Sequence, residues 1–183
     1  SSRYFRRAEA HNVLLVDEQG QPQSNPLLRS WIETPQVVFC AASIEKDGIR
    51  QQRSVLFVKP QYWVVVDHVF GKGEPVLTRL FHFPDVAVEM GERSARTTFA
   101  QGRNVWVTSS DGARLERREG WLPTGGATAR PAPVAAFVSK GPLPAALGTV
   151  LVPLAEGVAQ PRIETFAAGG PLAIGIRLLF PDG

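Results

Sequence analysis

Apolar and polar residues alternate along most of this chain in short runs with a period of about two residues. β-Branched and aromatic residues are enriched in these runs, and turn sequences such as Asp17-Glu18-Gln19-Gly20 and Gly71-Lys72-Gly73 separate them. This pattern is typical of strands that place one face in a shared core. The runs that we expect to form strands are residues 13–16, 37–42, 54–58, 62–66, 76–83, 86–90, 103–108, 113–118, 133–139, 148–153, 163–167 and 171–180.

The pattern predicts an all-β fold, an antiparallel β-sandwich of at least ten strands with almost no helix. No stretch combines helical periodicity with the length of a helix, and residues 8–10 are too few to count. Residues 120–133 carry Pro and Gly and are interpreted as a long loop. Because strand-like runs flank this loop, we expect one continuous domain over residues 1–183. The side chains expected in the core include Phe57, Trp63, Val65, Leu80 and Val107.

Composition is that of an ordinary globular protein, with 44% hydrophobic and 20% charged residues in 183 positions. The net charge of +3 comes without a basic block or a nucleic-acid motif, so we expect no nucleic acid partner. No apolar stretch approaches the ~20 residues that cross a bilayer, so we expect no membrane partner. The single cysteine, Cys40, lies in an apolar run and is expected to be buried. The N-terminus begins within the pattern and does not resemble a signal peptide, so we expect the chain to be part of a longer protein.

Three histidines are the candidates for metal binding or proton transfer. His11 directly precedes the strand at 13–16, where one ring nitrogen can ligate a metal while a neighbour fixes the other. A hydrogen-bonded structural histidine is the alternative at this position. His68 follows Asp67 at a strand end, and His82 lies between two phenylalanines, where a structural role is favoured.

Local spacing does not complete any familiar catalytic or metal site. A zinc site needs three or four ligands, and the chain has no H-x-H, H-x-x-x-H or C-x-x-C pair. It also has no G-x-S-x-G elbow and no glycine-rich phosphate loop between a strand and a helix. We therefore assign no catalytic residue within the chain.

Tyr4 stands among arginines, at Arg3, Arg6 and Arg7. Nearby guanidinium groups favour the ionised form of a tyrosine and can fork onto a carboxylate or a sulfate. An edge strand with exposed charges is the alternative explanation of this segment.

Several specific sequence blocks occur together along the chain. The most specific are A-H-N-V-L-L-V-D at residues 10–17 and the pair Y-W-V-V-V-D at 62–67 and F-H-F-P at 81–84. The others are R-Y-F at 3–5, R-S-V-L-F-V at 53–58, G-W at 120–121, P-A-P at 131–133 and T-V-L-V-P at 149–153. This succession resembles the C-terminal β-domain of the heparinase II/III-like family, which includes heparin, heparan sulfate and alginate lyases.

This resemblance implies a super-sandwich domain that closes against an N-terminal helical toroid, which is absent from the chain. Such enzymes cleave acidic, uronate-containing polysaccharide by β-elimination, with a Tyr or His base removing the C5 proton. The histidine of the A-H-N block belongs to a metal site, usually zinc, so His11 is the predicted ligand and its His and Asp partners lie upstream. Arg3, Tyr4 and Asn12 are the predicted substrate-binding residues. Gln52 stands where the family often has a histidine, which puts any substrate contact from that position in doubt.

The leading hypothesis is therefore the β-domain of a periplasmic or secreted polysaccharide lyase, which supports the cleft and supplies one metal ligand. The chain alone is predicted to be inactive. A non-catalytic carbohydrate-binding domain that uses Trp31 or Trp121 as a stacking platform is one alternative. A purely structural domain is the other.

Overall fold

The computed structural model describes residues 3–20, 26–125 and 128–181, and within them it contains fourteen strands and two single turns of 3₁₀-helix. The prediction of an all-β fold with at least ten strands and almost no helix is confirmed. The 3₁₀ turns are η1 (Tyr4–Arg6) and η2 (Ala8–Ala10). The strands are β1 (Leu14–Val16), β2 (Leu27–Glu33), β3 (Val37–Lys46), β4 (Ile49–Val58), β5 (Tyr62–Phe70), β6 (Val76–His82), β7 (Val88–Met90), β8 (Ser94–Thr97), β9 (Asn104–Ser109), β10 (Arg114–Pro123), β11 (Ala129–Lys140), β12 (Ala145–Leu154), β13 (Arg162–Ala167) and β14 (Ile174–Leu179).

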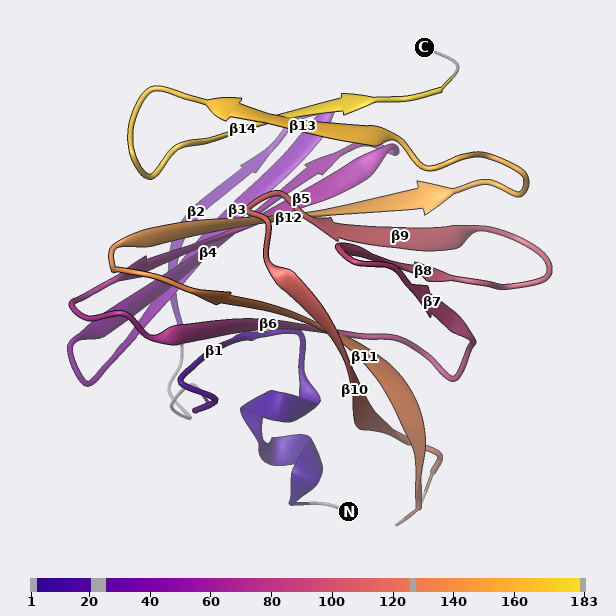
Figure 1. Ribbon diagram of the computed structural model, residues 1–183, viewed down its shortest axis with the longest axis horizontal. Helices are drawn as coiled ribbons and strands as arrows, with labels where there is room; N and C mark the ends of the chain where they lie inside the picture. The colour runs from indigo at the N-terminus through magenta and orange to yellow at the C-terminus, as the bar shows by residue number, and fades with distance from the viewer. Residues whose placement is uncertain (1–2, 21–25, 126–127, 182–183) are drawn as a thin grey trace.

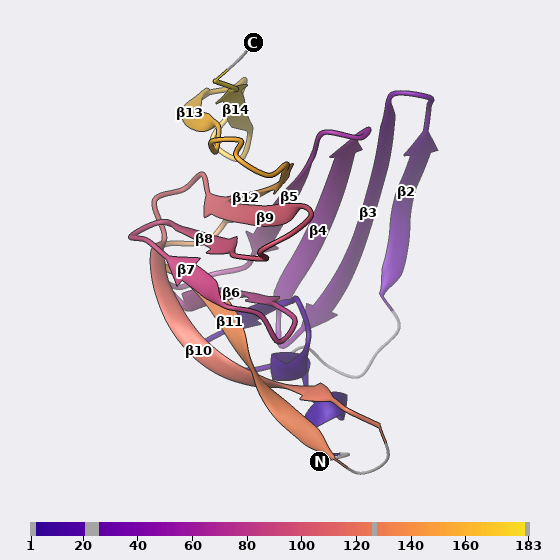
Figure 2. The same cartoon turned by 90° about the vertical axis from the view of Figure 1, so that its right-hand side faces the viewer.

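The strands form three antiparallel sheets in successive layers (Figure 1). A large sheet has the order β2-β3-β4-β5-β12-β9-β8-β7, and a small sheet has the order β1-β6-β11-β10. The β13–β14 hairpin lies on the outer face of the large sheet, on the side away from η1 and η2 (Figure 2). Among the described residues, no helix is long and apolar enough to span a membrane.

The main core lies between the inner faces of the large and small sheets. Phe81 and Phe137 of the small sheet meet edge to face, with ring centroids 5.9 Å apart, and both are buried. Val107 and Ala95 of the large sheet pack against them. Val65, Leu80 and Val107 are buried as predicted, because their alternation places them on these inner faces.

Three apolar residues of the large sheet that were expected in the core are only partly buried. Phe57 and Trp63 pair across β4 and β5 and stack with their ring centroids 4.3 Å apart, and Cys40 lies opposite Val55 in the same sheet. The prediction of burial is wrong for all three. The physical reason is that the four-stranded sheet is narrower than the eight-stranded sheet, so it leaves part of the β3–β5 surface without a covering layer (Figure 2).

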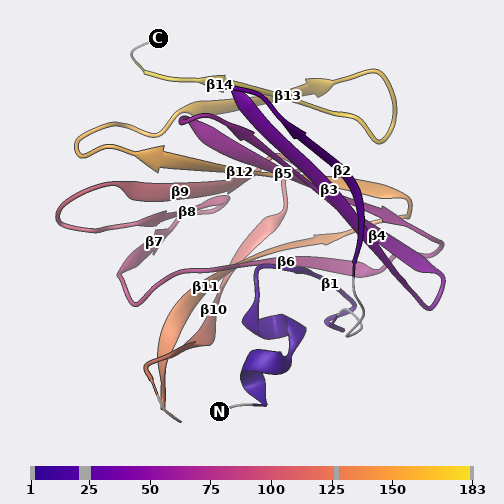
Figure 3. The same cartoon turned by 180° about the vertical axis from the view of Figure 1, so that it is seen from behind.

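The segment interpreted as a long loop is mostly strand. β10 and β11 form a hairpin whose register runs from Arg114↔Val138 to Pro123↔Ala129, so only residues 124–128 connect the strands. Residues 126–127, where Gly126 was interpreted as turn material, lie outside the described residues. The hairpin projects beyond the small sheet, beside η1 and η2 (Figure 3). Its extension places Trp121 next to the N-terminal segment.

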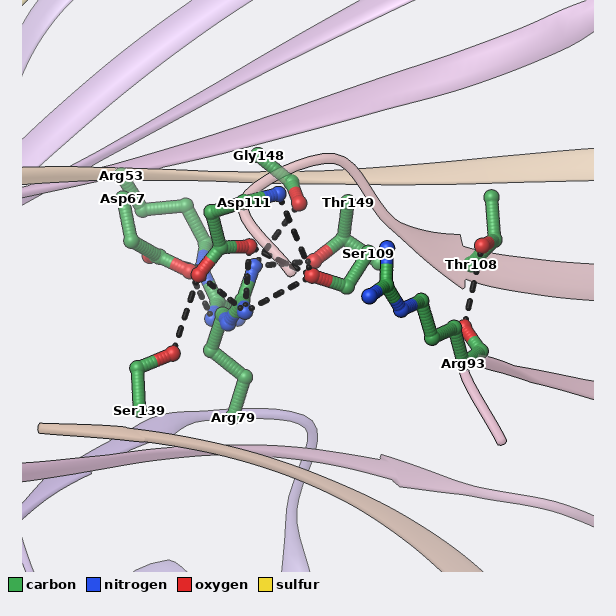
Figure 4. Close-up of polar contacts among 10 residues, drawn as sticks. All are labelled: Arg53, Asp67, Arg79, Arg93, Thr108, Ser109, Asp111, Ser139, Gly148 and Thr149. Carbon is green, nitrogen blue, oxygen red and sulfur yellow. Dashed lines mark hydrogen bonds and ion pairs between the residues drawn. The ribbon is translucent and has the colours of Figure 1, made fainter. Parts of the chain in front are cut away.

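A buried arginine joins the two large layers. The Arg79 side chain on β6 is completely buried, and its Nη2 donates to both carboxylate oxygens of Asp111 at 2.7 and 2.9 Å. Its Nη1 donates to the carbonyl of Gly148 and to Oγ1 of Thr149, both on β12 (Figure 4). Ser139 of β11 donates to the same Asp111 carboxylate at 2.9 Å. One charged pair thereby fixes the small sheet to the large one.

Candidate functional site

The N-terminal segment, which precedes strand β1, packs against the small sheet. Hydrogen bonds from the amide of Arg7 to the carbonyl of Tyr4, and from that of His11 to Ala8, close the two 3₁₀ turns. β1 then pairs with β6, and the apolar side chains of Ala8 and Val13 pack on a buried cluster that includes Leu15, Leu80 and Val134. These contacts bring the four predicted site residues, Arg3, Tyr4, His11 and Asn12, onto one short segment with a fixed place in the fold.

Asn12 is held by both main sheets. Its Oδ1 accepts the backbone N–H of His82 at 2.8 Å and lies 3.2 Å from Nδ1 of the same histidine. Its backbone carbonyl accepts a hydrogen bond from Nη1 of Arg53 on β4. The side-chain oxygen of Asn12 therefore anchors the segment to β6. Its predicted contact with substrate stays a prediction.

The arginine that holds Asn12 is itself clamped. Arg53 donates from Nε and Nη2 to the two carboxylate oxygens of Asp67, at 2.7 and 2.9 Å. Asp67 is 3% exposed, and the two residues face each other directly across β4 and β5. Burial lowers the pKa of Arg53, but the charge and hydrogen bonds of Asp67 outweigh it, so the net shift is upward and the guanidinium stays charged. Sequence reasoning missed this pair, although Arg53 begins one quoted motif block and Asp67 ends another.

The His11 ring is exposed and oriented by one hydrogen bond. Its Nε2 lies 3.1 Å from the carbonyl of Phe5, which can only accept, so Nε2 is the donor of this hydrogen bond. A metal-ligating histidine is usually oriented in this way, by donating its second N–H to a carbonyl. Within the part of the chain that the structure describes, no three His, Cys, Asp or Glu side chains are grouped to hold a metal. The predicted role of His11 as a metal ligand stays a prediction.

The two other histidines have structural surroundings. His82 is half-buried, and burial lowers its pKa; a carbonyl of Glu9 partly offsets this effect, while the proximity of His11 adds to it. His68 lies on the outer face of the large sheet, where its Nε2 is 3.0 Å from the carbonyl of Leu172. Gln52 pairs with His68 across β4 and β5, on the strand face away from Arg53.

Tyr4 meets the projecting hairpin. Its hydroxyl accepts the backbone N–H of Trp121 at 3.3 Å. A Cβ on the neighbouring Gly120 would lie 3.0 Å from that hydroxyl and 2.8 Å from Cγ2 of Val134, so only glycine permits this approach. A hollow of about 360 Å³ opens here, lined by Tyr4, Phe5, Trp121 and Ala129. Arg3 is exposed and directly precedes Tyr4, which lines this hollow.

The chain is thus a layered all-β sandwich whose N-terminal segment, with Tyr4, His11 and Asn12, is held in place by hydrogen bonds to both main sheets. Residues 1–163 match the family described as heparinase II/III-like, C-terminal. The chain belongs to this family and is its C-terminal domain.

Several known proteins resemble the chain. A heparin-sulfate lyase of Bacteroides stercoris is 21% identical over 126 residues, which are 66% of this chain and 19% of that protein. A solved heparinase III superposes with a TM-score of 0.83 at 18% identity, over 96% of this chain and 30% of that one. The heparan sulfate lyase HepC of Pedobacter heparinus gives 0.81 at 18% identity, over 97% and 31%. The chain thus spans about a fifth to a third of the length of these relatives.

Proposed function

We propose that this chain is the β-sandwich domain of a polysaccharide lyase that cleaves acidic, uronate-containing polysaccharide by β-elimination. The observation that carries the proposal is the clamped segment that holds Arg3, Tyr4, His11 and Asn12 in one place, in the C-terminal domain of the heparinase II/III-like family. The relatives named as heparin-sulfate and heparan sulfate lyases support this substrate class. A periplasmic or secreted location suits an enzyme whose substrate is extracellular polysaccharide.

In this proposal the domain supports a cleft whose catalytic groups come from an N-terminal helical toroid. Arg3 is exposed and carries a fork of donors suited to a carboxylate or a sulfate. Tyr4 is partly exposed beside it, and Asn12 presents its amide at the same segment. These three residues are the proposed substrate contacts of this domain.

His11 is the proposed metal ligand of the domain. Its Nδ1 would bind zinc while Phe5 retains the hydrogen bond to Nε2, and a His and an Asp of the preceding domain would complete the set. Bound zinc would cross-link the two domains and fix the geometry of the cleft.

The 183-residue chain alone is expected to show no lyase activity on heparan sulfate, alginate or hyaluronan. No acid–base pair is assigned within it, and the proposed catalytic groups belong to another domain. The measurement is absorbance of the unsaturated uronate product, with a protein that also contains the preceding helical domain as the positive control. Turnover by the short chain would contradict the proposed division of labour. If the protein that also contains the helical domain binds the polysaccharide but does not cleave it, the result would favour a carbohydrate-binding role for this domain.

In the longer protein, His11→Ala is expected to lower bound zinc from about one equivalent to well below half. A two-ligand remainder binds the ion far more weakly than a set of three. Elemental analysis after dialysis measures the content, and His68→Ala on the outer face is the matched control, expected to retain its zinc. Equal zinc in wild type and His11→Ala, or none in either, would return His11 to a structural role.

A further inference from the structure

The hollow beside Tyr4 combines features that suit a charged sugar. Tyr4 and Phe5 meet edge to face, with ring centroids 5.3 Å apart, and form one wall. Trp121, on the β10–β11 hairpin, forms another wall and is 41% exposed. An exposed aromatic ring beside a hollow offers a flat apolar surface with a polar edge, which the C–H face of a sugar ring can cover.

The other tryptophans lack this setting. Trp106 is buried in the cluster under β13–β14, and Trp63 is stacked on Phe57. Trp31 is 61% exposed, but it lies on β2, the edge strand of the large sheet. The hairpin of the small sheet therefore carries the one tryptophan that borders the predicted substrate-binding Tyr4.

Charge around the hollow favours an anion. Residues 3–10 contain three arginines and one glutamate, a net of +2 within a chain whose total is +3. Arg3, Arg6 and Arg7 are all exposed. Arg130 follows Ala129 on the hairpin and is paired with Asp85 at 3.0 Å, while Glu119 is an exposed carboxylate on β10. The cationic excess lies in residues 3–7, which flank Tyr4 and Phe5 of the hollow in the sequence.

The hollow is also preorganised. The hydrogen bond from the Trp121 amide to the Tyr4 hydroxyl fixes the two walls relative to each other, and Gly120 allows that close approach. The hairpin register is continuous from Arg114 to Pro123, so the segment that bears Trp121 is held along its length. Little ordering is then required when a ligand binds.

We propose that this hollow is a subsite for an acidic oligosaccharide, with Trp121 as the stacking platform and Arg3 and Arg6 as the anion contacts. The substrate class rests on the proposed function, but the site stands on its own geometry and is tested by binding without turnover. One sugar ring lies against Trp121, and its carboxylate or sulfate faces Arg3 and Arg6.

The test measures binding of a sulfated heparan sulfate tetrasaccharide to the 183-residue chain by calorimetry and tryptophan fluorescence. Trp121→Ala is expected to weaken binding roughly tenfold, as loss of an aromatic contact of about 1.5 kcal/mol implies. Trp31→Ala, which removes a more exposed tryptophan on the large sheet, is expected to bind as the wild type. A neutral tetrasaccharide of the same length is expected to bind at least tenfold more weakly than the acidic one. Matching urea midpoints for the two variants show that both remain folded.

Three outcomes would overturn the subsite. They are wild-type affinity in Trp121→Ala, an equal loss in Trp31→Ala, and no binding by the wild-type chain at millimolar tetrasaccharide. Equal affinity for the neutral tetrasaccharide would overturn its acidic specificity. A longer protein without lyase activity would instead overturn the proposed function and leave a tryptophan-dependent binding result intact.

Discussion

Arg79→Met will destabilise this domain by about 3–5 kcal/mol, the usual cost of removing one partner from a buried ion pair. The Arg79 side chain is fully buried, and its loss leaves the Asp111 carboxylate, which is only 16% exposed, without a cation. The carbonyl of Gly148 and the hydroxyl of Thr149 also lose a donor between the two sheets. The same substitution removes the side-chain hydrogen bonds that hold β6 against β12.

Urea unfolding followed by circular dichroism measures this loss. Arg162→Met is the matched control, because Arg162 also pairs with a carboxylate, that of Glu164, but its side chain is 72% exposed. Such an exposed pair contributes about 0–1 kcal/mol, so the control should unfold near the wild-type midpoint. If Arg79→Met unfolds within 1 kcal/mol of the wild type, the joint between the sheets is not a major source of stability.

Asp67→Ala is expected to cost about 2–4 kcal/mol and to loosen the candidate site, because it leaves the Arg53 charge without its carboxylate. The lower part of the range allows for the Arg53 side chain, which is 25% exposed and retains some solvent. Arg53 would then hold the carbonyl of Asn12 less firmly. The segment from η1 to β1 should open more often than it does in the wild type.

Limited trypsin digestion measures this opening directly, because Arg3, Arg6 and Arg7 provide cleavage sites on the segment. Cleavage there should be faster in Asp67→Ala by about the factor that the lost stability predicts, at tenfold for each 1.4 kcal/mol. Glu33→Ala breaks the Lys59–Glu33 ion pair, in which the glutamate is the more exposed side chain, and is the matched control. Digestion of Asp67→Ala at the wild-type rate would show that the clamp does not govern access to the segment.

The alternation of apolar residues predicted the fold class and most strands, and it failed where a strand has no buried face or where its buried face carries no large apolar side chain. β2 has the sequence Leu-Leu-Arg-Ser-Trp-Ile-Glu, with every residue exposed, so its apolar residues follow no period of two. β8 is four residues long and carries small and polar side chains around Ala95. In the 120–133 segment, Pro and Gly indicated a loop, but Gly120 and Pro131 are placed where the hairpin tolerates them.

The candidate site was predictable to the extent that it lies on one stretch of sequence. Tyr4, His11 and Asn12 stand in recognisable motifs, and the structure keeps them on one fixed segment. Arg53–Asp67 and Arg79–Asp111 could not be paired from sequence, because both depend on strand register or on how two sheets stack. Trp121 was named only as one possible platform, and the hairpin geometry sets it apart from Trp31.

The ribosome does not make the strands of the large sheet in the order in which they lie side by side. β2 to β5 are consecutive and can pair as they emerge, but the next neighbour of β5 is β12, which begins at residue 145. Until the ribosome has passed that point, β5 and β9 each present an unpaired edge, and Arg79 lacks its acceptors on β12. Such open edges invite pairing with other chains, and long-range closure is slow. Insertion of β12 is therefore the step at which a nascent chain of this kind most needs protection by chaperones.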